Sequence, residues 1–163
     1  MRESIAHRGP DSYGQQLWGS IGLAHQRLSI IDIDSGSQPI SYRGYSIVYN
    51  GELYNHKEIR KELEQLGHAL ESDCDTDVFL AAYTEWGVNS FKRFNGMFAA
   101  IIYDHGKDEM IAVRDRFGIK PLYVGDGPHG VRLFASEQQA ISEYDKSYKW
   151  DLNLQALDNY LSL

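Results

Sequence analysis

The sequence predicts an α+β domain built largely from antiparallel sheets. Strand and helix patterns come in mixed blocks along the 163 residues rather than in strict alternation. Residues 97–104 and 109–114 are apolar strand patterns on either side of a short polar loop, and residues 121–124 and 131–135 form a second pair around a glycine-rich turn. Strands joined by short turns run in opposite directions, so both pairs predict antiparallel hairpins.

The first half of the chain adds further strands. Residues 15–33 place apolar side chains among polar neighbours, as half-buried strands do. Residues 45–49 form a short apolar run that is closed by Asn50 and Gly51. This dipeptide is a hairpin signal, but a helical pattern follows it. We therefore expect Asn50 and Gly51 at the mouth of a strand-to-helix connection, where backbone amides are free to bind a ligand.

Helix signals follow this strand. Asn55 is a candidate N-cap with Glu58 three residues later, apolar residues then recur at helical spacing, and Gly67 is placed to end the helix. A second helix is expected over 76–86 with Asp75 as its cap. Shorter helical patterns occur at 90–94, 137–144 and 151–163.

The composition bounds the class of protein. Hydrophobic residues make up 42% and charged residues 24% of the chain, which is ordinary for a globular protein. The net charge is −7 and there is no basic run, so nucleic acids and anionic membrane surfaces are poor candidate partners. The longest apolar run, residues 97–103, is far shorter than the roughly 20 residues that a membrane helix needs.

Cysteine and histidine usage argues against a disulfide or a metal centre. Cys74 is the single cysteine, so no internal disulfide is expected. His7 and His25 lack a suitably spaced third ligand, so no metal site is predicted. These features, with no signal peptide at the start of the sequence, favour a cytoplasmic protein.

Five ordered segments are too particular to be generic core. They are His-Arg-Gly-Pro-Asp at 7–11, His-Gln-Arg-Leu-Ser-Ile-Ile-Asp at 25–32, Asn-Gly-Glu-Leu-Tyr-Asn at 50–55, Cys-Asp-Thr-Asp-Val at 74–78 and Arg-Asp-Arg-Phe-Gly-Ile-Lys-Pro-Leu-Tyr at 114–123. In this order and spacing they resemble the glutaminase domain of asparagine synthetase, a class II glutamine amidotransferase of the N-terminal-nucleophile hydrolases. The resemblance implies two antiparallel sheets stacked face to face between helices. It also implies hydrolysis of the side-chain amide of glutamine to glutamate and ammonia.

The resemblance assigns a grip for the head group of glutamine. Arg27 matches the arginine that clamps the α-carboxylate, for which a planar guanidinium is well suited. Asp75, together with Glu52, matches the group that binds the α-ammonium. Main-chain groups at Leu28 and Ile30 complete this grip. The alternative for Arg27 is a strand arginine at the surface, which the matching residues after it disfavour, and from the residues alone Asp75 is equally a helix cap.

The same resemblance assigns an oxyanion hole. The side-chain amide of Asn50 and the backbone N–H of Gly51 match the two donors that stabilise the developing oxyanion. Such donors are typically worth about 3–4 kcal/mol each in the transition state. The alternative for Asn50 and Gly51 is a tight turn with no chemical role.

One departure from the family concerns the nucleophile, which is a cysteine at the processed N-terminus whose own α-amine acts as the base. Here the sequence opens with Met1 and soon reaches the His7 motif. Cys74 is no substitute, because the carboxylates of Asp73 and Asp75 flank it and disfavour the attacking thiolate. We therefore expect an N-terminally incomplete domain with its first strand missing and no glutaminase activity of its own.

The expected organisation is an amidotransferase domain over residues 1–143, followed over 144–163 by a linker and the start of an absent synthetase domain. The intact parent would supply ammonia to the ATP-dependent amidation of aspartate or a related carboxylate. ATP and magnesium would bind the synthetase domain, and no cofactor is expected in residues 1–143. The alternative is a catalytically silent binding or interaction module. A lost strand would leave sheet surface exposed, which predicts association into homo-oligomers.

Overall fold

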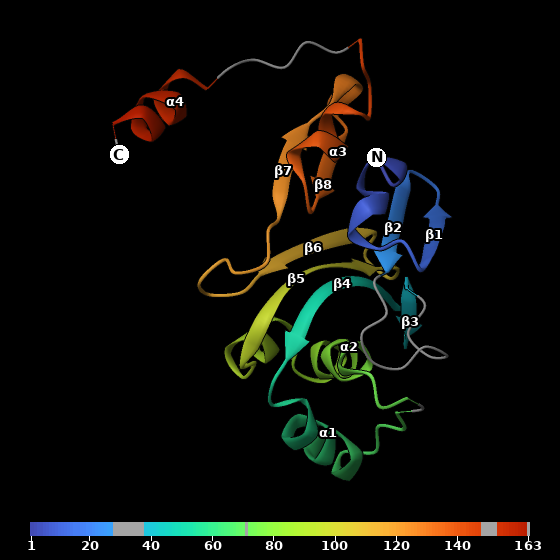
Figure 1. Cartoon of the computed structure of the whole chain (residues 1–163). Coiled ribbons are helices and arrows are strands. Elements are labelled where there is room, and N and C mark those ends of the chain that lie inside the picture. Colours follow the sequence, from blue (N-terminus) through green and yellow to red (C-terminus); the bar gives the residue numbers. More distant parts are fainter. Residues whose placement is uncertain (28–37, 71, 148–152, 163) are drawn as a thin grey trace.

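The computed structural model describes residues 1–27, 38–70, 72–147 and 153–162. Its centre is a four-stranded antiparallel sheet in the order β3-β4-β5-β6 (Figure 1). The strands are β3 (Ile40–Tyr42), β4 (Tyr45–Leu53), β5 (Gly96–Asp104) and β6 (Glu109–Arg114). β5 is almost wholly buried, because one face packs on helices and the other on a second layer of strands. The predicted hairpin of 97–104 with 109–114 is confirmed.

Helices lie on one face of this sheet. They are α2 (Asp75–Trp86), which packs on β3 and β4, and α1 (His56–Gln65), which packs on α2 and on Leu53 at the end of β4; a 3₁₀ helix, η2 (Gly87–Lys92), continues from α2. The ring of Phe79 on α2 is fully buried against Tyr49 of β4 and Phe98 of β5. Side chains at alternate positions of β4 and β5 thus face the helices, and those between them face the second layer.

The second layer consists, in the described part of the chain, of two separate two-stranded antiparallel sheets (Figure 1). One pairs β1 (Ser12–Trp18) with β2 (Ile21–Arg27), and the other pairs β7 (Tyr123–Asp126) with β8 (Arg132–Ala135). Leu23 of β2 packs with Ile101 and Tyr103 of β5, which places this layer opposite the helices. The α+β class with antiparallel sheets and helices is confirmed.

Short helices complete the fold. η1 (Glu3–Arg8) contacts β2, and α3 (Gln138–Ser142) packs on β7 and β8. η3 (Pro128–Gly130) joins β7 to β8, and α4 (Leu154–Leu161) falls within the helical pattern expected at 151–163. Within the described ranges, no helix is long and apolar enough to cross a membrane.

β4 corrects the expectation for Asn50 and Gly51. The strand does not stop at Tyr49 but runs through both residues to Leu53, with Asn50 opposite Ala99 and Gly51 opposite Phe98 on β5. A Cβ on Gly51 would lie 2.3 Å from the carbonyl oxygen of Met97, so glycine is needed here for close strand contact and not for a turn. The turn of the β3–β4 hairpin lies instead at Arg43 and Gly44, which both have positive φ.

Asn55 occupies the predicted N-cap position of α1, but the predicted capping interaction of its side chain is not made. Its Nδ2 donates to the carbonyl of Arg93 at 3.0 Å, and its Oδ1 accepts from the amide of Asn95 at 2.9 Å. Asn55 therefore ties the end of β4 to the segment that enters β5. The expected end of the helix at Gly67 agrees with the positive φ of that residue.

Candidate functional site

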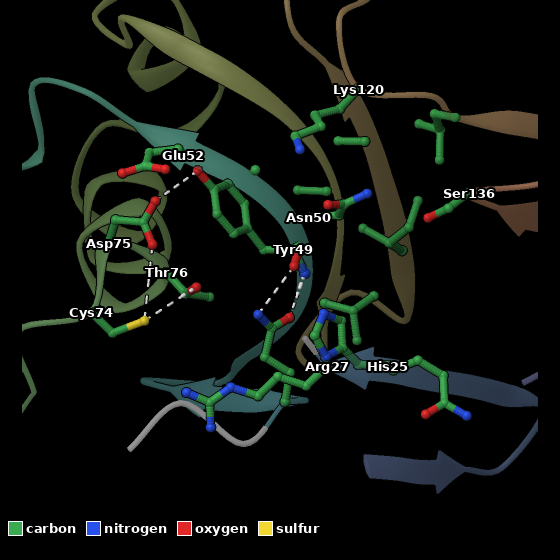
Figure 2. Close-up of a pocket in the computed structure, with 18 of the residues that line it drawn as sticks. His25, Arg27, Tyr49, Asn50, Glu52, Cys74, Asp75, Thr76, Lys120 and Ser136 are labelled. Carbon is green, nitrogen blue, oxygen red and sulfur yellow. Dashed lines mark hydrogen bonds between the residues drawn. The ribbon is translucent and has the colours of Figure 1, made fainter. Parts of the chain in front are cut away.

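A cavity of about 1180 Å³ lies between β2, β4, β5 and β8 and extends to the start of α2 (Figure 2). Its wall contains Arg27, Asn50, Gly51, Glu52 and Asp75, which are five of the seven predicted site residues. The other two, Leu28 and Ile30, lie outside the described residues. The structure thus brings together residues from β2, β4 and α2 that are far apart in the sequence. The roles assigned to them stay predictions.

One part of this wall is the edge of β4 that faces away from β5. At one point of the edge, the backbone of Tyr49 is paired with the side-chain amide of Gln38: Tyr49 N donates to Oε1 at 2.6 Å, and Nε2 donates to Tyr49 O at 3.1 Å. Further along, Leu53 N donates to Oδ2 of Asp75 at 2.8 Å. Alternate residues of a strand direct their amides to the same edge, so the N–H of Gly51 points out between these two anchors.

Asn50 contributes the second donor of this region. Its backbone faces β5, where it is opposite Ala99, and its side chain points into the cavity (Figure 2). A side-chain amide and a main-chain N–H on adjacent residues therefore both lie at one wall. This is the arrangement that stabilises an oxyanion in acyl transfer.

Asp75 is held by β4 and does not cap α2. It is the first residue of the helix, and the N-cap position belongs to Cys74, which makes no side-chain capping bond. Oδ2 of Asp75 accepts from the phenol of Tyr49 at 2.9 Å as well as from Leu53 N. Burial raises the pKa of the Tyr49 phenol, and the Asp75 carboxylate raises it further, so the phenol remains a donor. Asp75, which was predicted to cap the helix, thus holds its carboxylate in the cavity wall. Glu52, which also lines the cavity, is exposed to solvent.

The His-Arg-Gly-Pro-Asp motif supports the backbone of Arg27. Asp11 N donates to Arg27 O at 3.1 Å, and Pro10 forms a parallel bridge with the same residue. A Cβ on Gly9 would lie 2.4 Å from Arg27 N, so only glycine permits this approach. The motif therefore fixes the end of β2, from which Arg27 enters the cavity wall.

The first residues of this motif bind the segment that follows β8. His7 Nε2 lies 3.0 Å and Arg8 Nη1 3.2 Å from Oε1 of Glu137, just after β8. The hydrogen bond to His7, aided by Arg8, lowers the pKa of Glu137. His7 is thus engaged away from His25, which lines the cavity, and the described residues contain no cluster of ligands suited to a metal ion.

Sequence reasoning missed several cavity residues, including Gln38, Tyr49 and Lys120. Gln38 and Tyr49 act through contacts 11 and 26 residues away in sequence, which no local pattern reveals. Lys120 also lines the cavity, and Figure 2 shows its side chain on the same side as Asn50. A cationic side chain beside donor groups adds to the positive potential at this wall.

His25 carries a pH-dependent prediction. Burial lowers its pKa from 6.5 to about 4, a hydrogen bond to the Tyr49 backbone opposes this, and the charge of Arg27 lowers it again. The unfolded chain therefore takes up a proton on this histidine between pH 6.5 and 4 while the folded chain does not. We expect this residue to cost about 3 kcal/mol of unfolding free energy as the pH falls across that window, with full stability above it.

The measurement is urea unfolding from pH 7 to pH 4. His25→Asn keeps a donor for the Tyr49 backbone but does not titrate, so its stability is expected to depend less steeply on pH. His129→Asn, at an exposed position of η3, is the matched control and keeps the original slope. Equal slopes for all three proteins would contradict the prediction.

Comparison with known proteins decides the family. A family model described as a glutamine amidotransferase domain matches residues 1–163. The chain belongs to this family. It is 39% identical over 164 residues to asparagine synthetase [glutamine-hydrolyzing] 1 of Bacillus subtilis (strain 168), which covers 99% of the chain. It is 40% identical over 141 residues to asparagine synthetase [glutamine-hydrolyzing] 2 of Arabidopsis thaliana, covering 85% of the chain.

Solved structures agree with this family assignment. The glutamine phosphoribosylpyrophosphate amidotransferase of B. subtilis, complexed with ADP and GMP, matches with a TM-score of 0.65 and 25% identity over 74% of this chain and 28% of that chain. The amidotransferase chain described here spans about a quarter of the length of the curated relatives, 26% of the B. subtilis synthetase and 24% of the Arabidopsis one.

Proposed function

We propose that this amidotransferase domain is the glutaminase part of an asparagine-synthetase-type enzyme and that its cavity binds glutamine. The observation that carries the proposal is the meeting of three kinds of group at one cavity: a guanidinium at Arg27, a carboxylate at Asp75, and two uncharged N–H donors at Asn50 and Gly51. An amino acid with a side-chain amide presents the complementary groups, namely a carboxylate, an ammonium and a carbonyl oxygen.

In this proposal the α-carboxylate of glutamine pairs with Arg27, and its α-ammonium with Asp75 and the nearby Glu52. The carbonyl oxygen of the side-chain amide lies against Asn50 and the edge amide of Gly51. When a thiolate attacks the amide carbon, the C=O electron pair moves onto this oxygen, and the two donors stabilise the charge. The base that took the proton of the thiol then gives it to the amide nitrogen, so that collapse of the intermediate breaks the C–N bond, releases ammonia and leaves a thioester; water hydrolyses this to glutamate and regenerates the thiol.

Cys74 does not fit the role of the attacking thiol. Its Sγ lies 3.9 Å from Oδ1 of Asp75, beside the carboxylate assigned to the α-ammonium and not beside Asn50. It is the single cysteine of the 163 residues. We therefore assign the nucleophile to a thiol outside this sequence, as the resemblance to an N-terminal-cysteine family suggests.

The wider parts of the proposal concern the whole protein. Ammonia would pass to a synthetase domain that uses ATP and magnesium to amidate aspartate or a related carboxylate, with no cofactor in the amidotransferase domain. The names of the relatives and their greater length support this. A cytoplasmic location and homo-oligomers belong to the same proposal, supported by the lone cysteine and by exposed apolar residues such as Leu17 of β1.

The test is isothermal calorimetry of a polypeptide of residues 1–163 with glutamine. We expect binding that Arg27→Ala weakens about 100-fold, because truncating one partner of a desolvated charge pair costs about 3 kcal/mol. Arg132→Ala, at an exposed arginine of β8 that pairs with Asp126, is the matched control and leaves the affinity unchanged. No binding at millimolar glutamine would contradict the proposal and favour a silent interaction module. Ammonia release that is lost in Cys74→Ser would contradict the assignment of the nucleophile.

A further inference from the structure

We infer that Arg60 on α1 is a positioning residue that holds the segment before α2, so that Asp75 faces the cavity; this rests on the proposed glutamine site. Asp75 lies at the start of α2, and residues 66–74 connect that start to the end of α1. A carboxylate that binds a small ligand must be kept in place to within a fraction of an ångström. The contacts that hold the connecting segment in place therefore also determine the position of Asp75 in the site.

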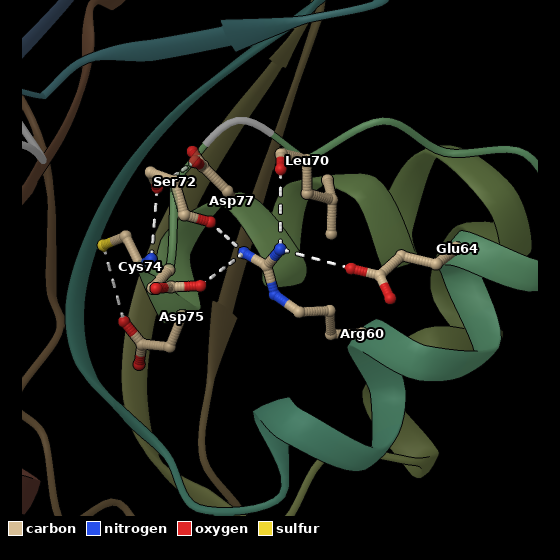
Figure 3. Close-up of polar contacts among 8 residues, drawn as sticks. Arg60, Glu64, Leu70, Ser72, Cys74, Asp75 and Asp77 are labelled. Atoms are coloured by element: carbon tan, nitrogen blue, oxygen red, sulfur yellow. Dashed lines mark hydrogen bonds and ion pairs between the residues drawn. The ribbon is translucent and has the colours of Figure 1, made fainter.

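Arg60 makes several contacts with this segment (Figure 3). Its Nη2 donates to the carbonyl oxygen of Ser72, and its Nη1 lies 3.5 Å from the carbonyl oxygen of Leu70 and 3.4 Å from Oε1 of Glu64. The Arg60 side chain is only 16% exposed. A mostly buried guanidinium therefore donates to two main-chain carbonyls of the connection.

The carboxylates around Arg60 contribute less than these carbonyls. Asp73 lies 3.9 Å away and its side chain is fully exposed to solvent, while Glu64 is about half exposed. Exposed ion pairs of this kind are weak. Two carbonyls on different residues call for a forked donor, which arginine has and glutamine or lysine lacks.

Ser72 relays the position of the connection to the helix start. Its Oγ accepts from Cys74 N at 3.1 Å and donates to Oδ2 of Asp77 in the first turn of α2. Arg60 holds the carbonyl of the same serine. The chain of contacts therefore runs from α1 through Arg60 and Ser72 to the residues on both sides of Asp75.

Cys74 gives a direct readout of this segment. It is the single cysteine and is partly buried, so the rate at which iodoacetamide alkylates it reports how often the connection opens. We expect Arg60→Gln to raise this rate about tenfold in protein that circular dichroism shows to be folded. Arg116→Gln makes the same chemical change at an exposed arginine of the β6–β7 connection and leaves the rate unchanged. An unchanged rate in Arg60→Gln overturns the inference.

A pair of ligands separates positioning from a general structural role. Glutaramate is glutamine without its α-amino group, so it does not need Asp75. We expect Arg60→Gln to weaken calorimetric binding of glutamine about tenfold and to leave glutaramate binding unchanged. Equal losses for both ligands, or no loss for glutamine, overturn the inference. If the unaltered chain binds no glutamine, the proposed function fails, and the alkylation of Cys74 still decides whether Arg60 holds the segment.

Discussion

Replacing Asp115 with alanine is expected to lower the free energy of unfolding by about 3 kcal/mol, because several backbone donors lose their acceptor together. Oδ1 of Asp115 accepts from the amides of Phe117 and Ile119, each at 3.0 Å. Oδ2 accepts from Lys120 N at 3.0 Å and from Phe98 N at 3.2 Å. The aspartate is 6% exposed, so water cannot replace all of these bonds. The loss is measured by urea unfolding at pH 7.

The control for this prediction is Asp126→Ala, which removes an exposed carboxylate paired with Arg132 and is expected to change stability by less than about 0.5 kcal/mol. Asp115 also predicts a response to acid. Burial alone would raise its pKa, but the four backbone donors outweigh burial and lower the pKa. The ionised Asp115 therefore adds its full share to the free energy of unfolding above about pH 4, and this share is lost as the pH falls further and the carboxylate is protonated. A stability within 0.5 kcal/mol of the unaltered chain in Asp115→Ala would contradict this role.

The second large effect is expected in Asp75→Asn, which should weaken glutamine binding about 100-fold while leaving glutaramate binding almost unchanged. The amide keeps the shape of the carboxylate, and its oxygen can still accept from Tyr49 and Leu53. What it loses is the negative charge opposite the α-ammonium of the ligand. Calorimetry with the two ligands measures this difference directly.

Asp126→Asn is the matched control for Asp75→Asn, since it removes one exposed negative charge at a residue that does not line the cavity. It should alter neither affinity. If Asp75→Asn weakens both ligands equally, the carboxylate acts by supporting the β4 edge and not by meeting an ammonium. If it weakens neither, the head-group assignment is wrong.

Much of the fold followed from local patterns. The β5–β6 hairpin was predictable because a long apolar run and a polar loop coincide there, α1 has a clear apolar face, and α2 is a mostly apolar helix. The errors share one physical cause. Asn50-Gly51, Asn55 and Asp75 have strong local preferences for a turn or a cap, but partners far along the chain override them. Such partners carry no signal in a short window of sequence.

The site was predictable only in part. The resemblance named Arg27, Asn50 and Asp75, and the structure places all three at one cavity, although they come from three different elements. Periodicity alone links none of them. The contacts of Gln38 and Arg60 could not be predicted, because both side chains donate to main-chain carbonyls. The side chain of the residue that carries such a carbonyl takes no part in the contact. Any residues at Tyr49 and Ser72 would present the same carbonyls, so no motif records the interaction.

The alternation along β4 makes the length of this strand more critical than its composition. Every second amide of β4 points away from β5, and the amides of Tyr49, Gly51 and Leu53 belong to this set. Inserting or deleting a single residue between Tyr49, which binds Gln38, and Leu53, which binds Asp75, would reverse this alternation. The Gly51 amide would then point toward β5, and the Asn50 side chain would point toward the helices. This segment is therefore expected to tolerate some amino-acid substitutions better than the insertion or deletion of a residue.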